Sequence, residues 1–145
     1  MKSRFCLKSG SYRIYGAAWI IALSLLAPSL VPRSFADDAR TRASLQRLDL
    51  QMRLEQVCDL EAMERIGHET SLYRPDRAKS DVISHPKHLG DILSASGAAF
   101  RSGGRWYALS FICKASADHL KVLTFDYRIG DVIPEAKWTD YGLWR

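Results

Sequence analysis

Three histidines provide the side chains with which this chain could bind a metal or transfer a proton. His85 and His88 flank Pro86 in a stretch with an aspartate on either side, so one short loop offers two imidazoles and a carboxylate to zinc or copper. Pro86 prevents a regular helix from fixing the two rings, and no third histidine lies near them in the sequence. We therefore expect no bound metal or cofactor. The alternative is a small secreted hydrolase or a metal-dependent enzyme that combines His85 and His88 with His119.

The sequence offers little support for nucleophilic catalysis. It contains no Gly-x-Ser-x-Gly motif, which positions the serine of many hydrolases, and Cys58 and Cys113 are better used in a disulfide. A catalytic triad can also assemble from residues that are far apart in a sequence, so a hydrolase is not excluded. The residues nevertheless favour a protein that is not an enzyme.

The most distinctive polar stretch contains two arginines, Arg74 and Arg77, beside a tyrosine and a proline. Arginine suits bidentate recognition of phosphate, sulfate or carboxylate, and Arg101 and Arg105 flank a Gly-Gly turn from which they could extend a cationic patch. These four arginines are the candidate ligand-binding residues. The alternative is a structural role, in which the stretch fastens a long loop and Asp76 bridges one arginine.

Charge and length limit the class of protein. The 145 residues fit a single globular domain, and the net charge of +5 suggests a polyanion partner. However, five of the 21 basic residues and none of the 16 acidic ones lie in residues 1–36, so the other 16 basic residues match the acidic ones. A neutral mature protein gives no reason to expect a nucleic-acid partner.

Residues 1–36 have the order of a secretory signal peptide. Four basic residues up to Arg13 precede an uncharged apolar run at 14–27, Pro28 ends that run, and Ser34 and Ala36 are the small residues that a signal peptidase reads. We expect cleavage after Ala36, a periplasmic or secreted protein, and membrane contact only through the signal peptide. The alternative is an uncleaved segment that anchors the protein in the inner membrane.

Export also explains the cysteines. Removal of the signal peptide removes Cys6 and leaves Cys58 and Cys113 in an oxidising compartment, where we expect them to form one disulfide.

The elements that position these residues are predicted to form one α+β domain over residues 49–145, after a flexible segment at 37–48. Apolar residues at helical spacing predict a kinked helix or a helix pair between Asp49 and Ile66, in which Asp59 caps the second part and Gly67 ends it. Residues 68–89 contain two prolines and lack periodicity, so we expect an irregular connection with a helical turn near 77–82.

Alternating residues after Gly90 predict an antiparallel meander of about three strands. The strands lie at 92–100, 105–116 and 120–129, and His119 caps the second turn between them. The helical region, tethered by the disulfide, should cover one face of this sheet, and the aromatic tail at 132–145 should pack as a lid.

Several motifs together resemble the bacterial family known as domain of unknown function 930. They are RLEQVC at 53–58 with EAM at 61–63, YRPDRA at 73–78, GAAFR at 97–101, WYALSFIC at 106–113, DH at 118–119 and WTDYGLW at 138–144. The resemblance implies an exported or envelope-facing protein and supplies no activity, cofactor or catalytic residue. The sequence thus predicts a non-catalytic binding module of the cell envelope whose partner is an envelope protein, a cell-wall component or a small anionic ligand.

Overall fold

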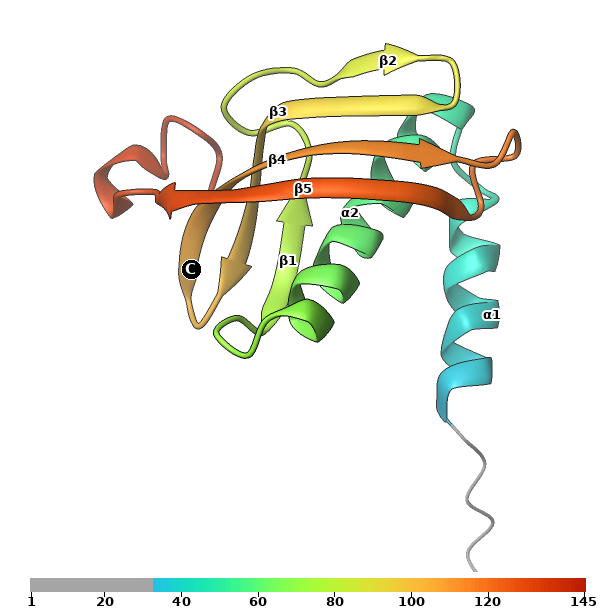
Figure 1. Ribbon diagram of the computed structural model, residues 1–145, viewed down its shortest axis with the longest axis horizontal. Coiled ribbons are helices and arrows are strands. Elements are labelled where there is room, and N and C mark those ends of the chain that lie inside the picture. Colours follow the sequence, from blue (N-terminus) through green and yellow to red (C-terminus); the bar gives the residue numbers. More distant parts are fainter. Residues whose placement is uncertain (1–32) are drawn as a thin grey trace, which may run out of the picture. The chain divides into compact units, whose positions relative to one another are not determined.

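The computed structural model describes residues 33–145, which form two helices, five strands and a short 3-10 helix (Figure 1). Residues 1–32, which carry most of the predicted signal peptide, lie outside the described residues. The elements follow the chain as α1 (Arg33–Leu45), α2 (Leu50–Glu69), β1 (Pro75–Lys79), β2 (Lys87–Leu89), β3 (Ile92–Ser102), β4 (Arg105–Ala115), β5 (Val122–Val132) and η1 (Glu135–Lys137). The predicted α+β class is confirmed.

The sheet is antiparallel and has five strands in the order β1-β3-β4-β5, with β2 paired to the opposite end of β3. The predicted meander corresponds to β3, β4 and β5, whereas the predicted number of strands is too small. Residues 68–89 contain β1 and β2, and the helical turn expected near 77–82 is wrong because Arg77, Ala78 and Lys79 pair with β3. Both strands lack a visible alternation, since β1 buries only Ala78 fully and β2 buries no residue fully.

Helix α2 is one continuous helix of 20 residues. Asp49 caps its first turn by accepting a hydrogen bond from the Met52 N–H at 3.0 Å. Leu54, Val57, Cys58, Ala62 and Ile66 line its buried face at the predicted helical spacing, whereas Leu50, which was expected on the same face, is exposed. The predicted kink and second cap are wrong, because Asp59 lies inside the helix and is buried with the apolar residues, and the helix continues past Gly67 to Glu69.

Helix α1 occupies much of the segment that we expected to be flexible, residues 37–48. Leu45 at its end is buried in the core, and the Arg53 guanidinium of α2 fixes the turn that follows. That guanidinium donates to four backbone carbonyls, those of Leu45, Gln46, Leu48 and Asp118. Neither described helix is long and apolar enough to cross a membrane.

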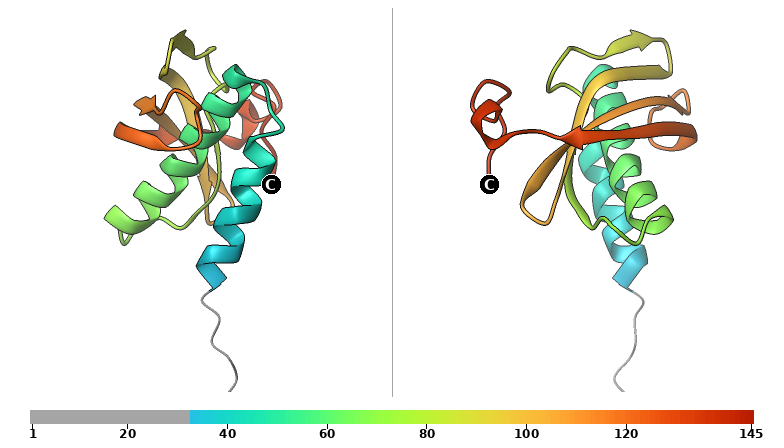
Figure 2. Two further views of the ribbon diagram at one scale, coloured as in Figure 1. Left: turned by 90° about the vertical axis from the view of Figure 1, so that its right-hand side faces the viewer. Right: turned by 60° about the vertical axis from the view of Figure 1, so that its left-hand side comes forward.

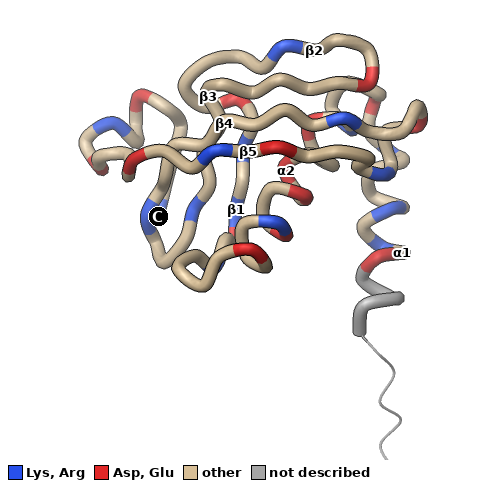
Figure 3. Tube along the Cα trace, viewed as in Figure 1, with Lys and Arg blue, Asp and Glu red and all other residues tan. Residues whose placement is uncertain are grey.

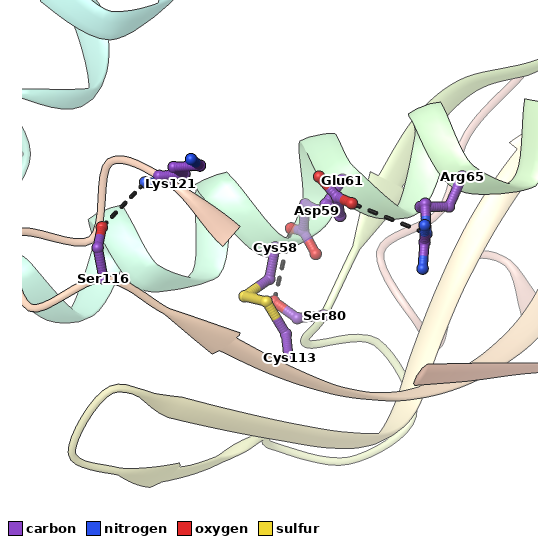
Figure 4. The surroundings of a disulfide bond; sticks show 8 residues. All are labelled: Cys58, Asp59, Glu61, Arg65, Ser80, Cys113, Ser116 and Lys121. Carbon is purple, nitrogen blue, oxygen red and sulfur yellow. Dashed lines mark hydrogen bonds and ion pairs between the residues drawn. A yellow bond between two sulfur atoms is a disulfide. The ribbon is translucent and has the colours of Figure 1, made fainter. Parts of the chain in front are cut away.

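The main core lies between α2 and one face of the sheet. Its largest fully buried residues on the strands include Phe100 and Leu93, and the aromatic rings of Phe111 and Phe125 pack with centroids 5.1 Å apart. The disulfide between Cys58 on α2 and Cys113 on β4 crosses this core, and both cysteines are fully buried (Figure 4). The predicted pairing of the two cysteines is confirmed.

The other face of the sheet carries a second core, formed with the C-terminal segment (Figure 2). Trp106 is fully buried there with Ala99, and Ile133, Trp138 and Leu143 cover them. The opposite burial of Trp106 and Phe111 follows the predicted alternation along β4. The aromatic tail therefore packs as the predicted lid, and the sheet is the middle of three layers.

The connection between β1 and β2 is attached to the sheet at Gly97. The N–H groups of Val82 and Ile83 both donate to the Gly97 carbonyl, at 3.2 and 2.7 Å. A Cβ at position 97 would lie 2.3 Å from the Ser84 backbone nitrogen, so only glycine allows this close approach.

Asp59 is a buried carboxylic acid beside the disulfide (Figure 4). It is 6% exposed, its Oδ2 accepts a hydrogen bond of 3.5 Å from the Ser80 hydroxyl, and its buried Oδ1 has no partner among the described residues. Burial disfavours the charged form and raises the pKa of Asp59 to about 7.

This pKa predicts that Asp59 makes the protein less stable as pH rises. Because the folded pKa exceeds the unfolded value, the free energy of unfolding should fall between about pH 4 and pH 7 and then level off. Asp59→Asn should remove most of that fall and stabilise the protein at about pH 8, by on the order of 3 kcal/mol.

Chemical denaturation across this pH range measures the effect. Asp131→Asn, which changes an exposed carboxylate outside α2, is the control and should leave the pH dependence unchanged. An Asp59→Asn variant with the same pH dependence as the wild type would contradict the assignment.

Candidate functional site

The four arginines that the sequence singled out do not converge. Arg77 on β1 and Arg101 on β3 are directly paired in the sheet register. Arg105 begins β4 next to Trp106, and because neighbouring residues of a strand point to opposite faces, its side chain leaves the sheet on the face away from Arg101. Arg74 lies in the turn before β1. The structure therefore joins Arg77 and Arg101 and separates both from the other two arginines.

Arg101 is held in a fixed geometry. Its Nε and Nη2 donate to the two carboxylate oxygens of Asp76 at 3.0 and 2.7 Å, and its guanidinium carbon lies 5.8 Å from the Trp106 ring centroid. A third hydrogen bond of 3.4 Å reaches the Trp144 carbonyl. The hydrogen bonds from Arg101 hold the pKa of Asp76 below its usual range, so this carboxylate stays charged and neutralises Arg101.

Two further cations lie beside the indole of Trp144. The Arg77 guanidinium carbon is 5.9 Å from the Trp144 ring centroid, and the Lys79 Nζ is 5.4 Å from it. Residues 77 and 79 share one face of β1 because they are two positions apart, and Ala78 between them is buried on the other face. Within residues 33–145 neither cation has an ion-pair partner.

We refer to Asp76, Arg77, Lys79, Arg101 and Trp144 as the β1 cluster. β1 is an edge strand, and Figure 3 marks basic residues along it. Three cations face one carboxylate here, and Trp144 is 46% exposed. The cluster therefore combines unneutralised positive charge, a half-exposed aromatic surface and a sheet edge, which suits binding of an anionic group.

Arg74 has the fastening role that the sequence left open as an alternative. Its guanidinium donates to the carbonyls of Thr70 and Tyr73 at 3.3 and 2.8 Å, and its N–H donates to the Ser102 hydroxyl at 2.8 Å. The Tyr73 ring packs edge-on against Phe100, with centroids 5.2 Å apart. These contacts connect the end of α2 to the hairpin of β3 and β4.

The histidines are engaged with separate partners. His85 is almost fully exposed and its Nδ1 lies 3.0 Å from Asp81, whereas the His88 Nε2 lies 2.9 Å from Glu55 on α2. The other ring nitrogen of His88 is buried with no partner among the described residues. Over the same part of the chain, no three His, Cys, Asp or Glu residues are placed to hold a metal ion.

His119 is buried between two elements and does not cap the turn between β4 and β5. Asp118 does so, by accepting hydrogen bonds from the Ser116 hydroxyl and the Leu120 N–H at 2.6 and 3.2 Å. The His119 ring nitrogens contact the Leu50 carbonyl at 2.7 Å and Asp91 at 3.0 Å. His88, Asp91 and His119 line one cavity of about 350 Å³. Both ring nitrogens of His119 are already used in contacts that link α2 to the turn between β2 and β3.

Sequence reasoning missed Lys79 as a site residue and did not place Trp144 beside the arginines of β1. Lys79 carried a weak signal, since two cations separated by one small residue would share a face of a strand, but the strand itself was not predicted. Trp144 is an aromatic residue, a type that is common at binding surfaces, but its approach to β1 depends on the path of the C-terminal segment.

The geometry predicts that Asp76→Asn loosens Arg101 and lowers thermal stability slightly. Asp76 is exposed, so the loss in Tm should be no more than a few degrees and should shrink in high salt. Since the folded pKa is depressed, the contribution of Asp76 is present at neutral pH and disappears as pH falls through that pKa. Thermal melts of both proteins at neutral and strongly acidic pH provide the measurement, and an equal difference at both would contradict the pairing.

Comparison with known proteins identifies the family. The family model described as Domain of Unknown Function (DUF930) matches residues 45–143, and neither the curated proteins nor the solved structures gave a match to the chain. The matched residues contain α2, all five strands, the disulfide and four of the five residues of the β1 cluster. The chain belongs to the DUF930 family.

Proposed function

We propose that this protein is an exported, non-catalytic binding domain of the cell envelope and that its β1 cluster holds an anionic group of its partner. The observation that carries the proposal is the placement of Arg77 and Lys79, two cations without an ion-pair partner in residues 33–145, beside the half-exposed Trp144 indole. Their charge is available because Asp76 is already engaged by Arg101.

The dimensions of the cluster favour a carboxylate or phosphate. Alternate residues of a strand lie about 6.6 Å apart, so the ends of Arg77 and Lys79 can meet on one anionic group. Arginine offers paired donors and lysine a point charge, and the indole adds apolar area for a neighbouring part of the ligand. An envelope protein, a cell-wall component and a small anionic ligand can each present such a group.

Export rests on the N-terminal residues and on the disulfide. A structural disulfide forms and persists in an oxidising compartment such as the periplasm. Cleavage after Ala36 would also leave Asp38 in the first turn of the shortened α1, where negative charge stabilises a helix.

Export is tested by determining the N-terminal residue and the thiol state of the protein recovered from cells. We expect the periplasmic fraction to contain a chain that begins at Asp37. When this chain is unfolded without reductant, Cys58 and Cys113 should show no free thiol. Mass spectrometry after thiol labelling measures both. Ala36→Arg, which places a large charged residue at the cleavage point, should leave the chain unprocessed. A full-length chain in the cytosol with both thiols reduced would contradict export.

Anion binding is tested by titration with soluble cell-wall fragments that carry free carboxylates, using calorimetry and tryptophan fluorescence. The Arg77→Ala/Lys79→Ala variant should bind at least about tenfold more weakly and unfold at nearly the same temperature. Added salt should weaken the wild-type affinity because the charges are exposed.

The controls separate the site from general electrostatics. Arg105→Ala removes an exposed arginine outside the β1 cluster and should leave the affinity unchanged, and fragments with amidated carboxylates should not bind. Equal binding by the double variant would remove the β1 cluster from the function. A wild type that binds neither the cell-wall fragments nor inorganic pyrophosphate nor acidic envelope proteins would argue against an anionic ligand.

A further inference from the structure

β5 is an edge strand of 11 residues, and β4 is its only strand partner among the described residues (Figure 1). Natural edge strands are commonly protected by proline, lysine, bulges or short length. β5 contains neither proline nor lysine. Its register with β4 shifts near both ends of the strand but is continuous from Thr124 to Ile129. The middle of β5 is therefore a regular edge to which another strand can pair.

The charges on this edge are arranged symmetrically about one residue. Asp126 and Arg128 lie on either side of Tyr127, both are exposed, and neither forms an ion pair within the described residues. They pair in register with Ile112 and Ser110 of β4, so both project from the sheet face opposite to α2. One acid and one base at this spacing make the strand complementary to itself when it is reversed.

We propose that a second copy of this chain pairs antiparallel with β5 across a twofold axis at Tyr127. This register places Asp126 of each copy opposite Arg128 of the other, and Phe125 opposite Ile129, so the two ion pairs and the backbone hydrogen bonds form together. The sheets of the two copies then form one continuous sheet. A strand that lacked a base and an acid two positions apart would not match Asp126 and Arg128 together.

Contacts from α2 hold β5 in place for pairing. The Tyr127 hydroxyl donates to Glu69 at 2.9 Å, and Arg65 lies 3.1 Å from the same carboxylate group. Arg65 also reaches the Phe125 carbonyl at 3.4 Å, a long hydrogen bond. Pairing with a second strand would replace this hydrogen bond to the Phe125 carbonyl, and Arg65 would keep Glu61 and Glu69 as ion-pair partners.

Charge reversal distinguishes this dimer from any other association. Asp126→Arg and Arg128→Asp each bring like charges together twice, and each should raise the dimer dissociation constant by about 10- to 100-fold. An equimolar mixture of the two variants restores opposite charges at both positions and should form a heterodimer. The Asp126→Arg/Arg128→Asp double variant should dimerise like the wild type.

Sedimentation velocity over a concentration series measures these states on the protein recovered from cells and purified without reductant, after removal of residues 1–36 so that Cys6 cannot link two copies. Arg105→Asp and Asp140→Arg change the net charge equally at exposed positions away from β5 and should leave the dimer intact. Circular dichroism establishes that each variant is folded, and the mixture and the double variant test the pairing even if one single variant is unstable.

A wild type that remains monomeric at sub-millimolar concentration would contradict the proposed dimer, and β5 would then pair with another partner or with none. A wild-type dimer that both single variants retain, or that the mixture of variants does not restore, places the interface elsewhere. Anion binding at the β1 cluster is independent of these outcomes.

Discussion

The disulfide between α2 and β4 is the constraint on which the arrangement of layers depends. It joins residues 55 positions apart, and the entropy that the unfolded chain loses when a loop of that length is closed corresponds to about 4 kcal/mol of free energy at 25 °C. Both cysteines are fully buried among apolar side chains, so the covalent link and the hydrophobic contacts act at the same place. With α2 fixed on one face of the sheet, the other face is left for the C-terminal segment, which carries Trp144 to β1.

The main elements of the fold could be predicted because their side chains repeat regularly. Alternation identified β3, β4 and β5, helical spacing identified α2, and the count of cysteines identified the disulfide. β1 and β2 could not be identified in this way, because a short strand that buries one residue or none has no pattern to detect. Asp59 was misassigned for a related reason: an aspartate in a helical stretch usually marks a cap, and its burial beside Ser80 depends on β1.

The candidate site could be predicted only in part, for the same physical reason. The composition of the segment around Arg77 indicated anion binding, and Arg77 and Arg101 are indeed neighbours. Whether an arginine contributes depends on strand register, which separated Arg105 from Arg101, and on local hydrogen bonds, which engaged Arg74. Lys79 and Trp144 belong to the β1 cluster through tertiary contacts that no single segment encodes.

Trp144 connects the second core to the β1 cluster. The Trp144 carbonyl accepts a hydrogen bond of 2.8 Å from the buried Trp106 indole, while the Trp144 ring lies beside Arg77 and Lys79. A change that displaced residue 144 would therefore leave the indole nitrogen of the buried Trp106 without this acceptor and would remove the ring beside Arg77 and Lys79. Helix α2 and the disulfide lie on the other face of the sheet and make none of these contacts, so the two faces depend on different parts of the chain.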